Sequence, residues 1–131
     1  MSTQDAVCGG CACGAVRYEL LGKPKFSFFC QCRQCQHLSG TGHSAAFLTD
    51  AQATTITGKL QFWDRTAANG NVVSQGFCPT CGSPVLNKNS GMADSFFVNA
   101  GTLDRPQELK PERVLYHDEA QPWDMLDPTK L

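Results

Sequence analysis

The stretch Gly9-Gly10-Cys11-Ala12-Cys13-Gly14 decides the fold, because it places two cysteines in a glycine-rich turn. A second turn much later in the sequence, Cys78-Pro79-Thr80-Cys81-Gly82, carries another pair. Glycine lets the backbone turn sharply, and Pro79 stiffens the second loop, so that both sulfurs of each pair can converge on one metal. The four thiolates of Cys11, Cys13, Cys78 and Cys81 are the ligand set of a closed, tetrahedral structural zinc site.

The segment Cys30-Gln31-Cys32-Arg33-Gln34-Cys35 packs three more cysteines into a short stretch. A catalytic zinc usually has three protein ligands and an open fourth position, which water or substrate can enter. We therefore predict a second zinc on Cys30, Cys32 and Cys35, which gives two zinc ions per chain. The open position favours a soft ligand such as a substrate thiol, which zinc holds as a thiolate at neutral pH.

Cys8 leaves a second partition open, since it forms another C-x-x-C pattern with Cys11. In that partition both zinc sites are closed and structural, with four ligands each: Cys8, Cys11, Cys78 and Cys81 in one, and Cys13, Cys30, Cys32 and Cys35 in the other. The simpler interpretation leaves Cys8 as a free thiol.

Short alternating segments predict a mainly β fold. Val16, Tyr18 and Leu20 fall on one side of residues 15–20, as a half-buried strand requires. Turn residues such as Asn69-Gly70 separate the segments, a spacing typical of antiparallel strands. We therefore expect small antiparallel sheets clipped together by zinc. Further strands are predicted at residues 25–29, 44–48, 54–57, 60–65, 72–77, 85–88 and 96–99.

Helix is predicted only at residues 33–39, with Gly40 as the stop signal. The tail from Arg105 contains several prolines and is expected to run extended over the surface. A lid over the site is a second possibility for Trp123. The expected anchors of the tail are Leu115, Tyr116 and Trp123.

Length and composition bound the class of protein. A chain of 131 residues with 41% hydrophobic and 18% charged residues suits one folded domain, residues 1–131. A net charge of −1 disfavours nucleic acid as a partner. No apolar stretch is long enough to span a bilayer, and Met1 to Ala6 lack the pattern of a secretory signal, so we expect a soluble, cytoplasmic protein. In a reducing cytosol eight cysteines favour metal, whereas a secreted chain would favour disulfides.

These motifs together resemble the family of glutathione-dependent formaldehyde-activating enzymes and their relatives grouped with centromere protein V. The resemblance is carried by the sequence from Gly9 to Tyr18, by Cys30-x-Cys32-x-x-Cys35, by Leu38-Ser39-Gly40 and by the sequence from Phe77 to Pro84. It continues weakly in residues 100–104 and 121–123, and so covers nearly the whole chain.

The resemblance implies a fold of two or three small antiparallel sheets that bind zinc. It also implies a structural metal on Cys11, Cys13, Cys78 and Cys81, and a catalytic metal on Cys30, Cys32 and Cys35. The implied activity is that of a carbon–sulfur lyase, which joins formaldehyde reversibly to the thiol of glutathione. A small thiol and a small aldehyde are the partners that follow from it.

The chain departs from the family pattern at two places. The family commonly reads Cys-His-Cys in the middle cluster, where this chain has Gln31. Near the end the family often has a histidine before its aromatic residue, where this chain reads Val114-Leu115-Tyr116 and His117 is displaced. A role that such a histidine plays in the family is therefore not expected of Gln31.

Several polar side chains have both a functional and an ordinary interpretation. His37 and His43 flank the open site in sequence as candidate acid–base groups or a fourth ligand, although surface or hydrogen-bonded loop histidines are commoner. His117 is expected to face solvent. Arg17 and Arg33 could bind a substrate carboxylate, but charges on a strand or helix surface are commoner. The aromatic residues expected mainly in the core are Phe26, Phe28, Phe29, Phe47 and Phe77.

Two functions remain. The first is a zinc-dependent carbon–sulfur lyase that acts on a small thiol adduct, glutathione plus formaldehyde or a related aldehyde, at Cys30, Cys32 and Cys35. The second is a non-catalytic, zinc-stabilised binding module with two structural metal sites. A ligand that can exchange at the second zinc separates the two, because two closed sites would have none.

Overall fold

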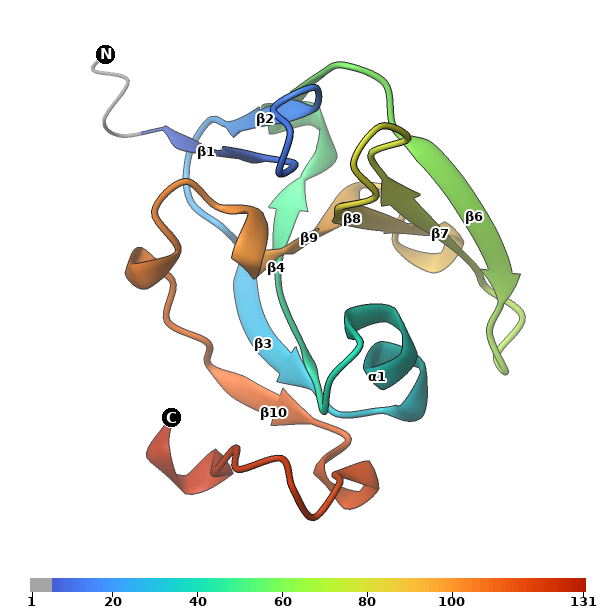
Figure 1. Cartoon of the computed structure of the whole chain (residues 1–131), viewed down its shortest axis with the longest axis vertical. Helices are drawn as coiled ribbons and strands as arrows, with labels where there is room; N and C mark the ends of the chain where they lie inside the picture. Colours follow the sequence, from blue (N-terminus) through green and yellow to red (C-terminus); the bar gives the residue numbers. More distant parts are fainter. Residues whose placement is uncertain (1–5) are drawn as a thin grey trace.

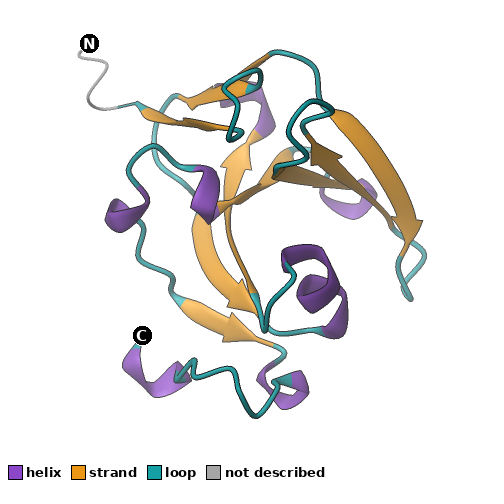
Figure 2. Cartoon of the chain, viewed as in Figure 1, coloured by secondary structure: helices purple, strands orange, loops and turns teal. Residues whose placement is uncertain are grey.

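The computed structural model describes residues 6–131, which form two β-sheets, one α-helix and several short 3-10 turns (Figures 1 and 2). The expected absence of a secretory signal rests mostly on residues 1–5, which lie outside the described residues. The predicted mainly β class is confirmed. Within residues 6–131 no helix has the length and apolar character needed to cross a membrane.

The smaller sheet has three strands in the order β1-β2-β5, and the larger sheet has seven in the order β10-β3-β4-β9-β8-β7-β6. The small sheet comprises β1 (Val7–Gly10), β2 (Arg17–Leu20) and β5 (Thr54–Thr57). The large sheet comprises β3 (Phe26–Cys30), β4 (Ser44–Asp50), β6 (Gln61–Thr66), β7 (Val72–Phe77), β8 (Pro84–Asn89), β9 (Ser95–Asn99) and β10 (Arg113–Leu115). The 3-10 turns are η2 (Ala51–Ala53), η3 (Ser90–Met92), η4 (Ala100–Thr102), η5 (Pro106–Glu108), η6 (His117–Glu119) and η7 (Pro128–Lys130).

Each of the eight predicted strands corresponds to a strand of the structure, whereas β1 and β10 were not predicted. The strand β10 also differs in direction, since it pairs with β3 in parallel and every other strand pair in the described part of the chain is antiparallel. The pairing puts Leu115 opposite Cys30. The tail therefore supplies the edge strand of the large sheet, and β10 ends next to the middle cysteine cluster.

The back face of the large sheet packs against the small sheet. Phe47, Leu86 and Val98 are paired across β4, β9 and β8, so their side chains point to the same side. All three are fully buried with Val16 and Tyr18 of the small-sheet region. This contact forms the main hydrophobic core.

The front face of the same sheet carries a cross-strand row of side chains, consisting of Trp63, Gln75, Asn87, Phe97 and Leu48 on β6, β7, β8, β9 and β4. Leu48 belongs to a second core cluster with Phe28, Cys30 and Ala46. Cys32 and Cys35 pack against this cluster, so the front face is the one that carries the middle cysteines. Figure 1 shows the helix α1 (Arg33–Ser39) lying within the curve of the large sheet.

The helix α1 has the bounds that the sequence predicted. The sulfur of Cys32 caps its first turn by accepting a hydrogen bond from the Cys35 N–H at 3.3 Å. Gly40 ends the helix with φ of 73°, a left-handed conformation that glycine adopts without strain. The cysteines therefore lie at the N-terminal end of α1, and Gly40 ends the helix at the opposite end.

The tail is anchored differently from the prediction. Leu115 packs into the second core cluster, as expected. Tyr116 and Trp123 are 58% and 62% exposed, so neither anchors the tail by burial. Strand pairing with β3 and hydrogen bonds to the side chain of Gln31 hold this segment instead.

Candidate metal centres

Four cysteines converge where the small sheet meets the turn between β7 and β8. The sulfur atoms of Cys11, Cys13, Cys78 and Cys81 all lie within 4.8 Å of one another. The sulfur of Cys13 is 3.6 Å from that of Cys11 and 3.8 Å from that of Cys78. A tetrahedral zinc with Zn–S bonds of about 2.3 Å needs sulfurs about 3.8 Å apart. The group therefore fits a closed zinc site.

Backbone N–H groups are directed at these sulfurs by the two turns. The Val16 N–H donates to Cys11 at 3.2 Å, and the Thr80 N–H donates to Cys78 at 3.4 Å. The Ala12 N–H also donates to the Ser83 hydroxyl at 3.0 Å, which joins the two turns directly. Such donors stabilise thiolates, and the shared cluster ties the small sheet to the large one.

The surroundings favour ionised sulfur on part of this group. Hydrogen bonds from the hydroxyl and backbone of Ser83 lower the pKa of Cys81 to about 5. The Val16 N–H lowers the pKa of Cys11 against the effect of burial. The Ala15 N–H pulls in the same direction at Cys13, but hydrogen bonding with Cys11 and desolvation raise the pKa of Cys13 to about 11. A divalent cation bound to this group would allow all four thiolates to coexist.

The second group lies where β3 runs into α1. Cys30 is the last residue of β3 and is buried, Cys32 caps the helix, and Cys35 lies in its first turn. Their three sulfur atoms lie within 4.8 Å of one another. Within the described residues no fourth His, Cys, Asp or Glu joins them at that distance. Three soft ligands suit zinc and leave one of its four positions to a ligand from outside the chain.

One sulfur of this group ionises far more readily than the other two. The hydrogen bond from Cys30 is the largest effect on Cys35, and with Ser44, Cys32 and Arg65 it outweighs burial and lowers the pKa of Cys35 to about 6. Hydrogen bonding with Cys35 and desolvation raise the pKa of Cys30. Desolvation is the main cause that raises the pKa of Cys32.

A hydrogen-bonded network lies behind this cluster. Gln31 is fully buried, and because it alternates with Cys30 along the chain its side chain points to the opposite side. Its Nε2 donates to Asp124 at 2.9 Å, and its Oε1 accepts from Nδ1 of His117 at 2.6 Å. Asp124 also lies 2.9 Å from Nδ1 of His43, whose ring contacts Phe29 of the back face. Two of the three histidines therefore support the cluster from behind.

The remaining polar candidates are engaged elsewhere. Arg17 holds Asp104 through two hydrogen bonds, of 2.9 and 2.5 Å. Arg33 bonds Gln36 within α1, and His37 is exposed and lies 3.4 Å from the Arg33 guanidinium. His117 is exposed, as predicted, although one ring nitrogen reaches Gln31.

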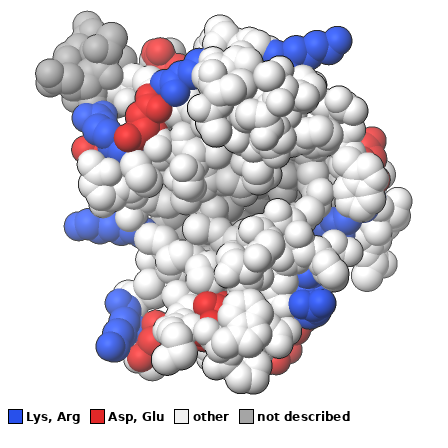
Figure 3. All heavy atoms as spheres, viewed as in Figure 1, with Lys and Arg blue, Asp and Glu red and all other residues white. Residues whose placement is uncertain are grey.

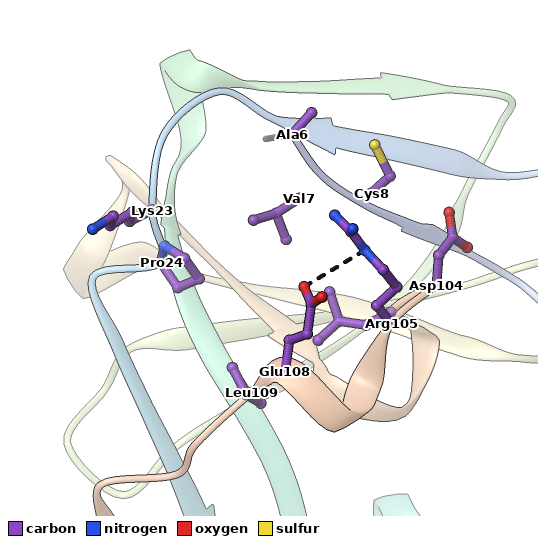
Figure 4. A pocket seen from close by; sticks show the side chains of 10 residues that line it. Ala6, Val7, Cys8, Lys23, Pro24, Asp104, Arg105, Glu108 and Leu109 are labelled. Atoms are coloured by element: carbon purple, nitrogen blue, oxygen red, sulfur yellow. Dashed lines mark ion pairs between the residues drawn. The ribbon is translucent and has the colours of Figure 1, made fainter. Parts of the chain in front are cut away.

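Cys8 belongs to neither group of sulfurs. It lies on β1 opposite Glu19 and lines a cavity of about 600 Å³ together with Val7, Leu103, Arg105 and Leu109. Figure 4 shows this cavity, with the 3.5 Å ion pair between Arg105 and Glu108 on one side. Burial and the charge of Glu19 raise the pKa of the Cys8 thiol. The alternative partition, in which Cys8 replaces Cys13, does not correspond to the observed grouping.

Sequence reasoning did not single out Asp124, Gln36 or Arg65. Asp124 and Gln36 join the tail to the residues around the cluster, and Arg65 acts electrostatically on Cys35 from β6. The alternation in β6 puts Arg65 on the same side as Trp63, which is a signal readable from the sequence. The position of Arg65 opposite α1 cannot be predicted without knowing how all the strands between β6 and β4 are paired.

Comparison with known proteins gives a family and a fold. One solved structure, described as a crystal structure of a Rhodobacter sphaeroides protein, matches with a TM-score of 0.59 and 22% sequence identity, over 79% of this chain and 97% of that one. It supports the fold alone. A search of curated proteins gives no match. The family model described as glutathione-dependent formaldehyde-activating enzyme matches residues 6–119. The chain therefore belongs to the glutathione-dependent formaldehyde-activating enzyme family.

Proposed function

We propose that this protein is a zinc-dependent carbon–sulfur lyase that acts on the adduct of a small thiol with a small aldehyde, with glutathione and formaldehyde as the first pair to test. The observation that carries the proposal is the contrast between the two cysteine groups. One has four converging sulfurs and is complete, while the other has three and lies on the front face beside Phe28 and Phe97. Membership of the family supports the substrate pair.

The proposed division of labour assigns Cys11, Cys13, Cys78 and Cys81 to a structural zinc and Cys30, Cys32 and Cys35 to a catalytic one. Bound at the second group, zinc would supply a position that holds a substrate thiol as its thiolate at neutral pH. A thiolate held there would attack the carbonyl carbon of formaldehyde: a C–S bond forms, the C=O π bond breaks, and the carbonyl oxygen takes up the proton that the thiol released, which gives the S-hydroxymethyl adduct. The reverse reaction breaks the same bond.

The residues around the cluster would hold its three sulfurs in place and exclude water from one side of them. The Cys35 N–H and the capping geometry hold Cys32 at the helix end, and β3 fixes Cys30. Gln31, His117 and Asp124 fix the loop from behind. The neighbouring Phe28 and Phe97 exclude water from one side, which strengthens electrostatic interactions at the sulfurs. Because glutathione and free thiols belong to reducing compartments, we propose the cytoplasm as the place of action.

The test is exchange spectroscopy of formaldehyde and glutathione, in which the exchange rate is compared with the spontaneous rate for protein that carries two zinc ions per chain. We expect acceleration by the wild type and none by Cys32→Ser. A panel of other small thiols identifies the preferred substrate. If fully loaded protein accelerates exchange with no thiol of the panel, the lyase assignment fails and a binding module with two structural sites takes its place.

A further inference from the structure

Two buried hydrogen-bond donors on the front face of the large sheet have no partner. Within the described residues, the buried side-chain nitrogens and oxygens that lack a hydrogen bond are Nε of Arg65 and Nε2 of Gln75. A buried donor without a partner costs about 1–3 kcal/mol, so such groups are rare in folded proteins and point to a missing acceptor. Both groups donate, so the missing partner is an acceptor.

The two side chains lie close enough to share one acceptor. Gln75 on β7 is paired with Trp63 on β6, and Arg65 is two residues beyond Trp63 on the same strand. Arg65 and Gln75 are therefore diagonal neighbours on one face, with Cβ atoms about 7 Å apart, within the reach of two long side chains. A carboxylate, with two acceptor oxygens, is the group that an arginine fork and an amide N–H can bind together.

This pair faces the middle cysteine cluster. Gln75, Asn87, Phe97 and Leu48 form one row across the front face, and Leu48 belongs to the same core cluster as Cys30. The large sheet curves, so that β6 and β7 face α1 across its concave side (Figure 1). The space-filling view shows this side of the molecule hollowed between its two halves (Figure 3). The charge of Arg65 is also one of the smaller causes that lower the pKa of the Cys35 thiol, which agrees with this placement.

From this arrangement we infer that Arg65 and Gln75 form a carboxylate subsite, which selects thiols that carry an acidic group and orients their sulfur toward Cys30, Cys32 and Cys35. The inference rests on the proposed function, since it assumes that a thiol reaches that cluster. Arg65 and Gln75 are positioning residues, and the reaction itself stays at the sulfur.

Charge supports the same choice of ligand. Three thiolates and one divalent cation leave a net negative charge at the middle cluster, so an acidic thiol is repelled unless a cation faces it. Arg65 supplies that cation, and its partly buried position weakens screening by solvent. A neutral acceptor such as an amide offers this pair one uncharged oxygen, whereas a carboxylate offers two oxygens and a negative charge.

The experiment measures binding of two matched probes, 3-mercaptopropionate and its neutral amide 3-mercaptopropionamide, by calorimetry to protein carrying two zinc ions per chain. We expect the wild type to bind the acid about tenfold more tightly than the amide, as a charge-assisted bidentate contact provides. Arg65→Gln should bind the two equally, and Arg65→Lys should keep part of the preference. In NMR spectra of the wild type, the Nε–H resonance of Arg65 should shift with the acid and not with the amide.

Lys88→Gln is the matched control, because it removes a positive charge from the opposite face of the same sheet, where Lys88 is exposed over the ring of Phe62. It should keep the tenfold preference. Equal binding of both probes by the wild type, or a preference that survives Arg65→Gln, overturns the carboxylate subsite and leaves the thiol site standing. If neither probe binds the wild type, the thiol site of the proposed function fails, and the carboxylate subsite fails with it.

Discussion

The Nδ1 atom of His117 donates a hydrogen bond to Oε1 of Gln31 at 2.6 Å, across 86 positions of sequence. Since an amide oxygen only accepts, this contact fixes the proton of His117 on Nδ1. The amide nitrogen of Gln31 is used at the same time by Asp124. The residue between Cys30 and Cys32 is therefore a junction that binds the tail to the back of the cysteine cluster.

Removing this junction should destabilise the fold. Gln31→Ala deletes a fully buried side chain and removes one hydrogen-bond partner each from Asp124 and His117, so we expect a loss of about 2–3 kcal/mol in the free energy of unfolding. Urea denaturation at a fixed zinc concentration measures it. Gln34→Ala is the control, because Gln34 is exposed on α1. Equal midpoints for the two variants would contradict a structural role for the junction.

The two cysteine groups should respond differently to serine. Cys78 is fully buried in the main core, and Cys78→Ser should prevent folding, since a structural zinc supplies folding free energy of order 10 kcal/mol. Cys32→Ser should stay folded, because serine also caps a helix, and its zinc content should fall from two ions per chain to one. Circular dichroism and elemental analysis of both variants test this split. Unfolding of both to the same extent would show that the groups share one role.

The sulfurs of the middle cluster should react in a defined order once their metal is removed. After mild chelation to one zinc per chain, Cys35, with its pKa lowered to about 6, is a thiolate at pH 7 and should be alkylated first by iodoacetamide. Its rate should fall as the pH drops through about 6, whereas Cys30, with a raised pKa, should gain reactivity only as the pH rises.

Mass spectrometry can follow this order directly. Trypsin cleaves after Arg33, so residues 26–33 carry Cys30 and Cys32 while residues 34–59 carry Cys35 alone. Label that appears first in the earlier peptide would contradict the expected ionisation.

A glycine of β1 should tolerate no side chain. A Cβ at Gly9 would lie 2.3 Å from the carbonyl oxygen of Thr102 and 2.3 Å from the Tyr18 hydroxyl, and the Thr102 backbone belongs to η4. We expect Gly9→Ala to cost about 3 kcal/mol of stability through overpacking. Gly101→Ala should be nearly neutral in the same urea experiment, because a Cβ at Gly101 would meet no atom of the described residues within 4 Å. A neutral Gly9→Ala would mean that η4 moves freely against β1.

The strands and the helix were predicted well, because their signals are local: apolar and polar residues alternate within each strand, and Gly40 ends the helix directly after its last residue. The grouping of Cys13 with Cys78 follows from the two glycine-rich turns. The parallel pairing of β10 with β3 was not predictable in this way, since a three-residue strand carries almost no periodicity. Nor could the sequence show that Gln31 binds two residues of the tail.

The positions of Arg65 and Trp123 likewise could not be predicted from local sequence. The position of Arg65 relative to Cys35 depends on the register of several strands and on the curvature of the sheet, which no local pattern encodes. Trp123 has the character of an anchor because tryptophan is usually buried, yet polar contacts of its neighbour Asp124 hold this segment. Exposure of a large aromatic residue is decided by the docking of the backbone around it.

The contacts of Gln31 also set the order in which the two cysteine groups can be completed while the chain is being translated. A growing chain that has emerged as far as Cys81 already contains all four sulfurs of the closed group. The three middle cysteines emerge much earlier, but Gln31 finds neither His117 nor Asp124 until the tail has been translated. The nascent protein can thus bring the four sulfurs of the closed group together while the three-cysteine cluster still lacks the contacts to Gln31 that the finished chain provides.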